Sequence, residues 1–135
     1  MKGIVYNGTT TELVDGLTLR APGPREVVVQ VAAAGLCHSD ISYMSGMYPV
    51  PSPGVCGHEA AGVVAEVGNA VTHVQPGDHV IIATLAACGF CQYCMDGRPT
   101  ACRATLGNWS QPFTLNGDPI YNFAATSAFA EKTLV

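Results

Sequence analysis

Short apolar runs separated by polar residues, glycine and proline recur along this 135-residue chain. Runs of this length that are rich in β-branched and aromatic residues predict β-strands. One run is much longer: VVVQVAAAGLC at 27–37 predicts a strand that is buried along most of its length. Shorter strands are predicted at 4–7, 12–14, 17–19, 60–68, 77–85, both ends of 113–123 around the turn NGD, and 129–135.

Helical periodicity occurs only at 39–46, SDISYMSG, where Ser39 or Asp40 stands near the N-terminus as capping residues do. The proline-rich stretch YPVPSPG at 48–54 predicts an extended loop. Many short strands of even spacing predict one mostly β domain over residues 1–135, a barrel or a sandwich. No strand–GxGxxG–helix unit occurs, so these residues encode no dinucleotide-binding domain.

The composition limits the kinds of partner that the chain can bind. Hydrophobic residues make up 48% of the chain and charged residues 12%, which argues against disorder and suggests that some surface is normally covered. The net charge is −4 and the six basic residues do not cluster, so we expect no nucleic-acid partner. No apolar run approaches the roughly 20 residues that cross a bilayer, and the start lacks a signal peptide's apolar stretch. We therefore expect a cytoplasmic protein with reduced thiols and no membrane partner.

Four of the six cysteines lie within CGFCQYCMDGRPTAC, residues 88–102. Four thiolates in so short a loop can close tetrahedrally on one Zn²⁺ and leave no position open for water or substrate, so the predicted role is structural. The alternatives are an iron–sulfur cluster, a disulfide pair or a redox C-x-x-C, and spacing and compartment favour zinc over all three. We place this zinc lobe at about 86–106, with the ligands Cys88, Cys91, Cys94 and Cys102.

A second, sparser group consists of Cys37 in LCHSD and His58 in GHEAAG. Both residue types bind zinc, but a spacing of 21 residues is a weak signal by itself. The alternative interpretation is a core cysteine beside a histidine that hydrogen-bonds a backbone carbonyl. From these residues alone the two interpretations carry about equal weight.

Four motifs occur together in one order: CHSD at 37–40, GHE at 57–59, PGD at 76–78 and the C-x2-C-x2-C-x7-C spacing. At these distances they resemble the zinc-dependent alcohol dehydrogenases of the medium-chain dehydrogenase/reductase superfamily. The resemblance covers essentially the whole chain and implies only the N-terminal catalytic domain of such an enzyme, a GroES-like, partly open β-barrel with short helices and a zinc-knuckle lobe. The nucleotide-binding Rossmann domain is expected downstream of Val135.

The resemblance implies a role for each matching position. Cys37 and His58 match two ligands of the catalytic zinc, whose third ligand is expected downstream. In this family the zinc acts as a Lewis acid that lowers the pKa of a small alcohol, so that an alkoxide releases hydride to NAD(P) and an aldehyde forms. The chain alone is therefore predicted to be inactive, with a filled structural zinc site and a partly filled catalytic one.

Three residues around these ligands match further family positions. Ser39 matches the hydroxyl that relays the substrate proton, and Asp40 matches the carboxylate that orients the ligand histidine. A helix cap is the alternative for both. Glu59 matches an acidic residue that can approach the metal in some states, and its alternative is a solvated acid at the start of a strand.

Other positions are matched less firmly or depart from the family. His38 matches a basic residue over the cofactor pyrophosphate, with an exposed histidine as the alternative. Thr84 stands where relatives often carry a bulky pocket aromatic, so a wider pocket is expected, and Phe123 matches an apolar channel residue or plain barrel core. Ser42 replaces a histidine of the usual proton path and cannot act as a base near neutral pH, so the proton must leave through water or another route. Cys56 matches no ligand and is expected to be buried, with a substitute ligand role left open.

The leading hypothesis is thus the catalytic-domain fragment of a zinc-dependent alcohol dehydrogenase. The fragment is also expected to self-associate through the surface that its missing partner domain would cover. A zinc-stabilised binding module without catalysis explains the cysteines equally well, but not the spacing of CHSD and GHE. Two further alternatives are a thiol switch at Cys91 and Cys94, and a polyol or formaldehyde-adduct dehydrogenase of the same superfamily.

Overall fold

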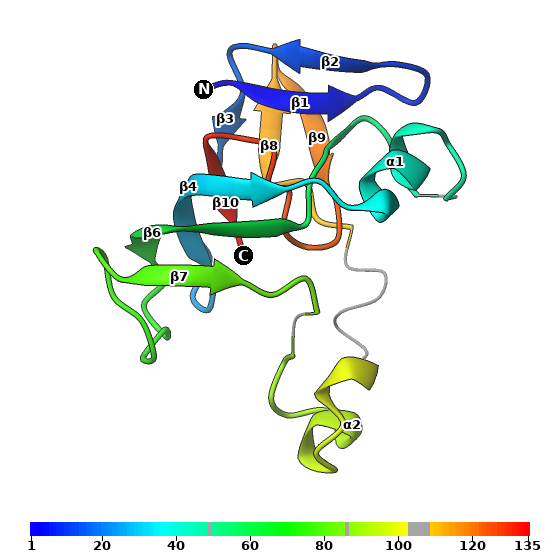
Figure 1. Cartoon of the computed structure of the whole chain (residues 1–135). Helices are drawn as coiled ribbons and strands as arrows, with labels where there is room; N and C mark the ends of the chain where they lie inside the picture. The colour runs from blue at the N-terminus through cyan, green and yellow to red at the C-terminus, as the bar shows by residue number, and fades with distance from the viewer. Residues whose placement is uncertain (49, 86, 103–108) are drawn as a thin grey trace.

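The computed structural model describes residues 1–48, 50–85, 87–102 and 109–135 (Figure 1). The short helices are α1 (His38–Met44), α2 (Gln92–Met95) and the 3-10 turn η1 (Pro99–Ala101). The strands are β1 (Gly3–Tyr6), β2 (Thr11–Val14), β3 (Thr18–Leu19), β4 (Val27–Gly35), β5 (Gly54–Val55), β6 (Glu59–Val67), β7 (His79–Ile82), β8 (Phe113–Leu115), β9 (Asp118–Asn122) and β10 (Lys132–Leu134).

The strands form two sheets. One has the order β2-β1-β5-β9-β8-β3 and the other the order β10-β4-β6-β7. The pairing is antiparallel except between β5 and β9, which run parallel. Within the described residues the two sheets stay separate and meet through an isolated bridge between Gly3 and Ala130. This is the mostly β, partly open barrel that the sequence predicted, and α2 lies well away from both sheets (Figure 1).

Alternation along the strands buries three apolar clusters. The first, around Phe113 and Val55, lies in the six-stranded sheet, and the second, around Val29 and Val64, lies in the four-stranded sheet. The third consists of Tyr6, Tyr43, Cys56 and Phe123, so it joins α1 to β1 and to the segments around β5 and β9. This third cluster holds α1 against the barrel, and α1 carries the residues next to Cys37.

The prediction for 27–37 was right about a strand and wrong about its burial. Only Val27, Val28 and Val29 of β4 are buried, and from Gln30 onward the strand is exposed or half-buried. The distal half of β4 still pairs with β6 up to Gly35 opposite Glu59. Small alanine side chains there satisfy the apolar pattern without reaching a core, so the strand extends past the packed layer and carries Cys37 beyond it.

Other elements were shifted or missed. The helix predicted at 39–46 begins and ends earlier, at 38 and 44, and the strand predicted at 77–85 shrinks to 79–82. The two-residue β5 lies inside the stretch predicted as a proline-rich loop, because two residues show no periodicity. The helical turns α2 and η1 in the cysteine segment were missed for the same reason.

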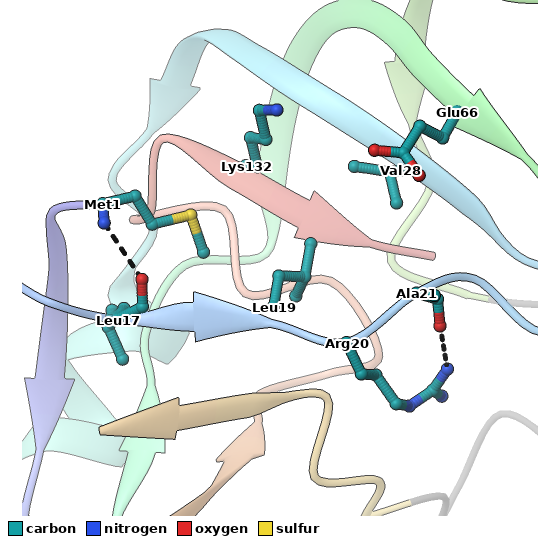
Figure 2. Close-up of a pocket in the computed structure, with 8 residues that line it drawn as sticks. All are labelled: Met1, Leu17, Leu19, Arg20, Ala21, Val28, Glu66 and Lys132. Atoms are coloured by element: carbon teal, nitrogen blue, oxygen red, sulfur yellow. Dashed lines mark hydrogen bonds between the residues drawn. The ribbon is translucent and has the colours of Figure 1, made fainter. Parts of the chain in front are cut away.

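A cavity of about 440 Å³ lies where β3 passes β10 (Figure 2). Within it the N-terminal amino group of Met1 donates to the carbonyl of Leu17 at 3.0 Å, and the Arg20 guanidinium donates to the carbonyl of Ala21. None of the predicted site residues lines this cavity, which is bounded by Met1, Leu17, Leu19, Arg20, Ala21, Val28, Glu66 and Lys132.

Several large apolar side chains are exposed. Ile81 is 87% exposed, and exposed side chains also occur at Leu36, Met47, Phe90 and Met95. Self-association through such residues stays a prediction. Among the described residues, no helix is both long enough and apolar enough to span a membrane.

Gly57 offers a test of how the turn before His58 is built. Its φ is +89°, and a Cβ there would lie 2.7 Å from the backbone nitrogen of Phe129. That nitrogen donates to the Cys56 carbonyl at 2.9 Å, so it cannot yield without losing a hydrogen bond. We expect Gly57→Ala to lower the free energy of unfolding for two reasons. An alanine in the left-handed backbone conformation costs about 1–2 kcal/mol, and overpacking against Phe129 costs about 1–3 kcal/mol more.

The matched control is Gly77→Ala, because Gly77 has a similar φ of +97° and nothing within 4 Å of its Cβ position. Urea unfolding of both variants measures the difference. Equal losses of stability would contradict the close approach at Phe129.

Candidate metal centres

The pairing of β4 with β6 brings Cys37 and His58 together. The two strands are antiparallel with Gly35 opposite Glu59, so the chain two residues past Gly35 lies beside the residue just before Glu59. Cys37 follows β4 as the N-cap of α1, and His58 immediately precedes β6. Residues 21 positions apart in sequence therefore meet at one end of the four-stranded sheet.

Asp40 ties these two positions to each other. Its side chain is fully buried, with one carboxylate oxygen 2.9 Å from His58 Nδ1 and the other accepting from the backbone N–H of Cys37 at 2.9 Å. A buried carboxylate is costly unless it is fully hydrogen-bonded, and here both oxygens have a partner. Because an ionised carboxylate can only accept, His58 carries its proton on Nδ1. The nitrogen left for a metal is Nε2.

Both predicted roles of Asp40 therefore coexist. It contacts His58 Nδ1, and from the third position of α1 it also accepts a hydrogen bond from the backbone N–H of the N-cap residue. The N-cap itself is Cys37, so Ser39 is not the cap residue, and Asp40 caps the helix from its third position. The helix begins one residue earlier than predicted because the chain leaves β4 directly into the helical turn.

Aromatic rings hold His58 from the side of the core. Phe123 and the imidazole form a T-shaped pair with 5.6 Å between ring centroids, and Tyr43 stacks on Phe123 at 4.4 Å. Both aromatic residues are buried, and burial raises the pKa of the Tyr43 hydroxyl well above its usual value. Phe123 thus belongs to the core and touches a candidate ligand at the same time.

Cys56 lies two residues before His58 and has the opposite character from Cys37. It is fully buried within the Tyr6, Tyr43 and Phe123 cluster, and burial raises the pKa of its thiol to about 12. A thiol held protonated in this way is a poor metal ligand. The expectation of a small buried residue fits this environment, and the substitute ligand role does not.

The donor atoms of Cys37, His58 and Glu59 all lie within 4.8 Å of one another. A thiolate, an imidazole and a carboxylate are donor types that zinc takes. The residues present therefore fit a zinc ion. Glu59 is exposed at the start of β6 and its carboxylate still reaches this cluster, so its predicted approach to a metal stays a prediction that the geometry allows.

The remaining predicted site residues differ in their contacts and in their burial. The Ser39 hydroxyl accepts a weak hydrogen bond from the Cys37 thiol at 3.9 Å, whereas His38 is exposed at the start of α1. Ser42 is buried on α1, and Thr84 is half-buried in the segment that leaves β7. The cofactor contact of His38 and the pocket role of Thr84 stay predictions.

The four clustered cysteines form a separate centre on the lobe. Cys91 is the N-cap of α2, Cys94 lies within it and Cys102 follows η1. The Sγ atom of Cys91 lies 3.6 Å from Sγ of Cys94 and 3.9 Å from Sγ of Cys102. All four Sγ atoms lie within 4.8 Å of one another. Zinc–sulfur bonds of about 2.3 Å place tetrahedral sulfurs about 3.8 Å apart, so the spacing fits zinc.

The same distances exclude disulfides, whose sulfurs are about 2.05 Å apart, and none of the six cysteines forms one. Backbone N–H groups donate to the sulfurs, from Cys91 to Cys88 at 3.3 Å and from Cys88 to Cys102 at 3.4 Å. Such contacts stabilise thiolates around a metal. Two ends of the predicted lobe, residue 86 and residues 103–106, lie outside the described residues.

The four thiols of this centre affect one another's ionisation. The backbone N–H of Gly89 acts to lower the pKa of Cys94, but desolvation and hydrogen bonds with the other three thiols raise it to about 11. Four thiols this close cannot all ionise near neutral pH unless a metal compensates their charge. The lobe also touches the barrel, since the Arg25 guanidinium lies 5.5 Å from the ring centroid of Phe90.

The chain is similar to known dehydrogenases over nearly its whole length. Residues 23–135 match the family described as the alcohol dehydrogenase GroES-like domain. The chain is 41% identical to an S-(hydroxymethyl)glutathione dehydrogenase of Escherichia coli O1:K1 / APEC, over 95% of this chain and 37% of that protein. It therefore spans little more than a third of the length of this curated relative.

Two crystal structures extend the comparison. An alcohol dehydrogenase zinc-binding domain protein from Burkholderia ambifaria has a TM-score of 0.87 at 36% identity, covering 99% of this chain and 39% of that one. Benzyl alcohol dehydrogenase from Acinetobacter calcoaceticus has a TM-score of 0.83 at 35% identity, covering 98% of this chain and 38% of that one.

Asp40→Asn tests the link between Asp40, Cys37 and His58. The asparagine amide keeps the shape of the carboxylate, but its NH₂ group replaces one acceptor oxygen. That group then faces an N–H donor, either of His58 or of the Cys37 backbone. We expect a loss of about 1–3 kcal/mol in the free energy of unfolding of the metal-free chain. Zinc affinity at the Cys37 and His58 site should fall about 10- to 100-fold.

The control for Asp40 is Asp15→Asn, because the exposed Asp15 accepts one hydrogen bond from the N–H of Gly16. That change should stay within about 0.5 kcal/mol. Denaturant titration and competition with a chelator measure the two effects. Wild-type zinc affinity in Asp40→Asn would refute the orienting role.

Cys102→Ser tests the lobe. We expect the wild-type chain to hold about one zinc firmly, at the four-cysteine centre, and a second only partially. Because Cys102 is a buried ligand, the serine variant should lose the firm zinc, whereas Cys56→Ala should keep it. Elemental analysis after mild chelation decides this, and two firmly held zinc ions in the wild type would be the contrary result.

Proposed function

The chain belongs to the family of alcohol dehydrogenase GroES-like domains, and we propose that it forms the catalytic domain of a zinc-dependent, NAD(P)-linked alcohol dehydrogenase. The observation that carries the proposal is the buried Asp40 carboxylate, which fixes His58 beside Cys37 and Glu59. A core histidine without a metal has no need of a thiol and a second carboxylate at the same point. The relatives, with their zinc and alcohol dehydrogenase names, support this assignment.

In this proposal Cys37 Sγ and His58 Nε2 hold the catalytic zinc, with Glu59 as a further donor. Bound zinc supplies Lewis-acid chemistry that lowers the pKa of an alcohol. Asp40 keeps the proton of His58 on Nδ1 and thereby keeps Nε2 directed at the metal. Phe123 excludes water from the side of the imidazole that faces the core.

The Ser39 hydroxyl is the group that we propose receives the proton of the alcohol. It lies next to the Cys37 thiol and is half-buried, so it borders both the metal site and solvent. Ser42, one turn further along α1, is 4% exposed and is no base near neutral pH. The proton therefore leaves through water beyond Ser39 and not along the helix.

The four-cysteine lobe takes a structural zinc in this proposal. Its four sulfurs close the coordination shell, so no position remains for substrate. A thiol switch at Cys91 and Cys94 would need those two sulfurs to act as a pair, whereas they belong to a set of four. A binding module without catalysis leaves the contact between Asp40 and His58 without a purpose.

The substrate class is a small alcohol and its aldehyde, with a formaldehyde adduct as the second candidate. The name of the 41% identical relative, S-(hydroxymethyl)glutathione dehydrogenase, favours the adduct. The name of the benzyl alcohol dehydrogenase favours an aromatic alcohol. Hydride transfer also needs a nucleotide-binding domain, which these 135 residues do not encode, so we propose that the chain alone does not turn over substrate.

The proposal is tested in the complete gene product that contains these residues. It should reduce NAD⁺ or NADP⁺ when given a primary alcohol or S-(hydroxymethyl)glutathione. His58→Ala should lower kcat by more than about 100-fold, because it removes a ligand and not only an outer partner. Cys56→Ala is the control with expected wild-type turnover. A complete protein that binds zinc but oxidises no alcohol or adduct would refute the proposed activity.

A further inference from the structure

Glu59 reaches the metal cluster across a glycine on the neighbouring strand. In the register of β4 with β6, Gly35 lies directly opposite Glu59. A Cβ added at Gly35 would lie 2.6 Å from Glu59 Oε2 and 3.4 Å from Glu59 Cβ. The Glu59 side chain therefore folds back over the Gly35 backbone and fills the space in which a side chain at Gly35 would stand.

The backbone at Gly35 does not itself require glycine. Its φ is not among the positive values that L-residues avoid, in contrast to Gly57 at +89°. The obstacle also differs. A Cβ at Gly57 would meet the backbone nitrogen of Phe129, and one at Gly62 would meet the backbone carbonyl of Gln30, whereas at Gly35 the nearest atom ends a flexible side chain. An alanine at Gly35 would thus move a carboxylate and leave the strands in place.

That carboxylate is one of three donors within 4.8 Å of one another, together with Cys37 Sγ and the imidazole of His58. Glu59 is exposed, so no surrounding core holds its side chain in this position. Space over Gly35 is what allows the carboxylate to turn toward Cys37. A methyl group in that space would push Oε2 away from the strand end that carries the ligand.

We propose that Gly35 is a positioning residue for the metal site: its missing side chain lets the Glu59 carboxylate lie beside Cys37 and His58. This inference rests on the proposed metal site, and it adds a residue that itself offers no donor atom. Gly35 acts only through Glu59, so its effect must vanish when the carboxylate is removed.

The experiment is a Co²⁺ titration of the 135-residue chain whose four-cysteine centre already holds zinc. The variants are Gly35→Ala, Glu59→Gln and the double variant, and the visible absorption of Co²⁺ bound to Cys37 and His58 is the signal. We expect each single variant to weaken Co²⁺ binding by about tenfold or more and to change the d–d bands. Gly35→Ala should weaken binding no further in the Glu59→Gln background.

Gly23→Ala is the matched control. A Cβ at Gly23 would also meet a glutamate carboxylate, Glu26 Oε2 at 2.9 Å, but that carboxylate pairs with Arg20 and lies outside the metal cluster. It should leave the Co²⁺ affinity unchanged. Thermal unfolding of the zinc-loaded, cobalt-free chains checks that Gly35→Ala keeps the fold.

The outcomes separate this inference from the proposed function. Wild-type Co²⁺ affinity and spectrum in Gly35→Ala would overturn the role of Gly35 and leave the metal site standing. The same loss in both backgrounds would also overturn it, because Gly35 would then act through the fold. A wild-type chain that binds no Co²⁺ beyond its zinc-filled lobe would overturn the metal site and the inference together.

Discussion

The candidate active site depends on one buried carboxylate. Asp40 has no exposed surface, and each of its oxygens accepts one hydrogen bond, from the Cys37 backbone and from the His58 ring. An ion in that position is tolerable only while both bonds are made. The start of α1, the end of β4 and the turn before β6 are therefore held in one arrangement. If His58 moved away, the buried Asp40 carboxylate would keep only its hydrogen bond from the Cys37 backbone.

The rest of the fold supplies what this carboxylate needs. Pairing of β4 with β6 brings the two ligand positions together, and the Tyr43 and Phe123 rings hold α1 and the imidazole against the barrel. Gly57 lets the chain pass close to Phe129 just before His58. The four-cysteine lobe lies apart from this network (Figure 1).

The motifs CHSD and GHE pointed to Cys37, Asp40 and His58, and the structure brings these three residues together. Their roles at a metal stay predictions, because they rest on local spacing and on a family resemblance. The burial of 27–37 was overestimated, since alanine is apolar but too small to show whether it reaches a core. The place of Glu59 over Gly35 could not be predicted, because it depends on a cross-strand register with two irregularities. The two-residue β5 and the helical turns of the lobe are too short for any periodicity.

The contact with Asp40 fixes His58 with its proton on Nδ1 and leaves Nε2 for a metal. Long-range ¹H–¹⁵N NMR of the metal-free chain measures this directly, because it distinguishes the two neutral tautomers of each histidine. We expect the neutral ring of His58 to be the Nδ1–H tautomer alone, and the neutral ring of the exposed His38 to average between the two tautomers. A neutral His58 ring with its proton on Nε2, or one that averages as His38 does, would show that Asp40 does not fix the histidine.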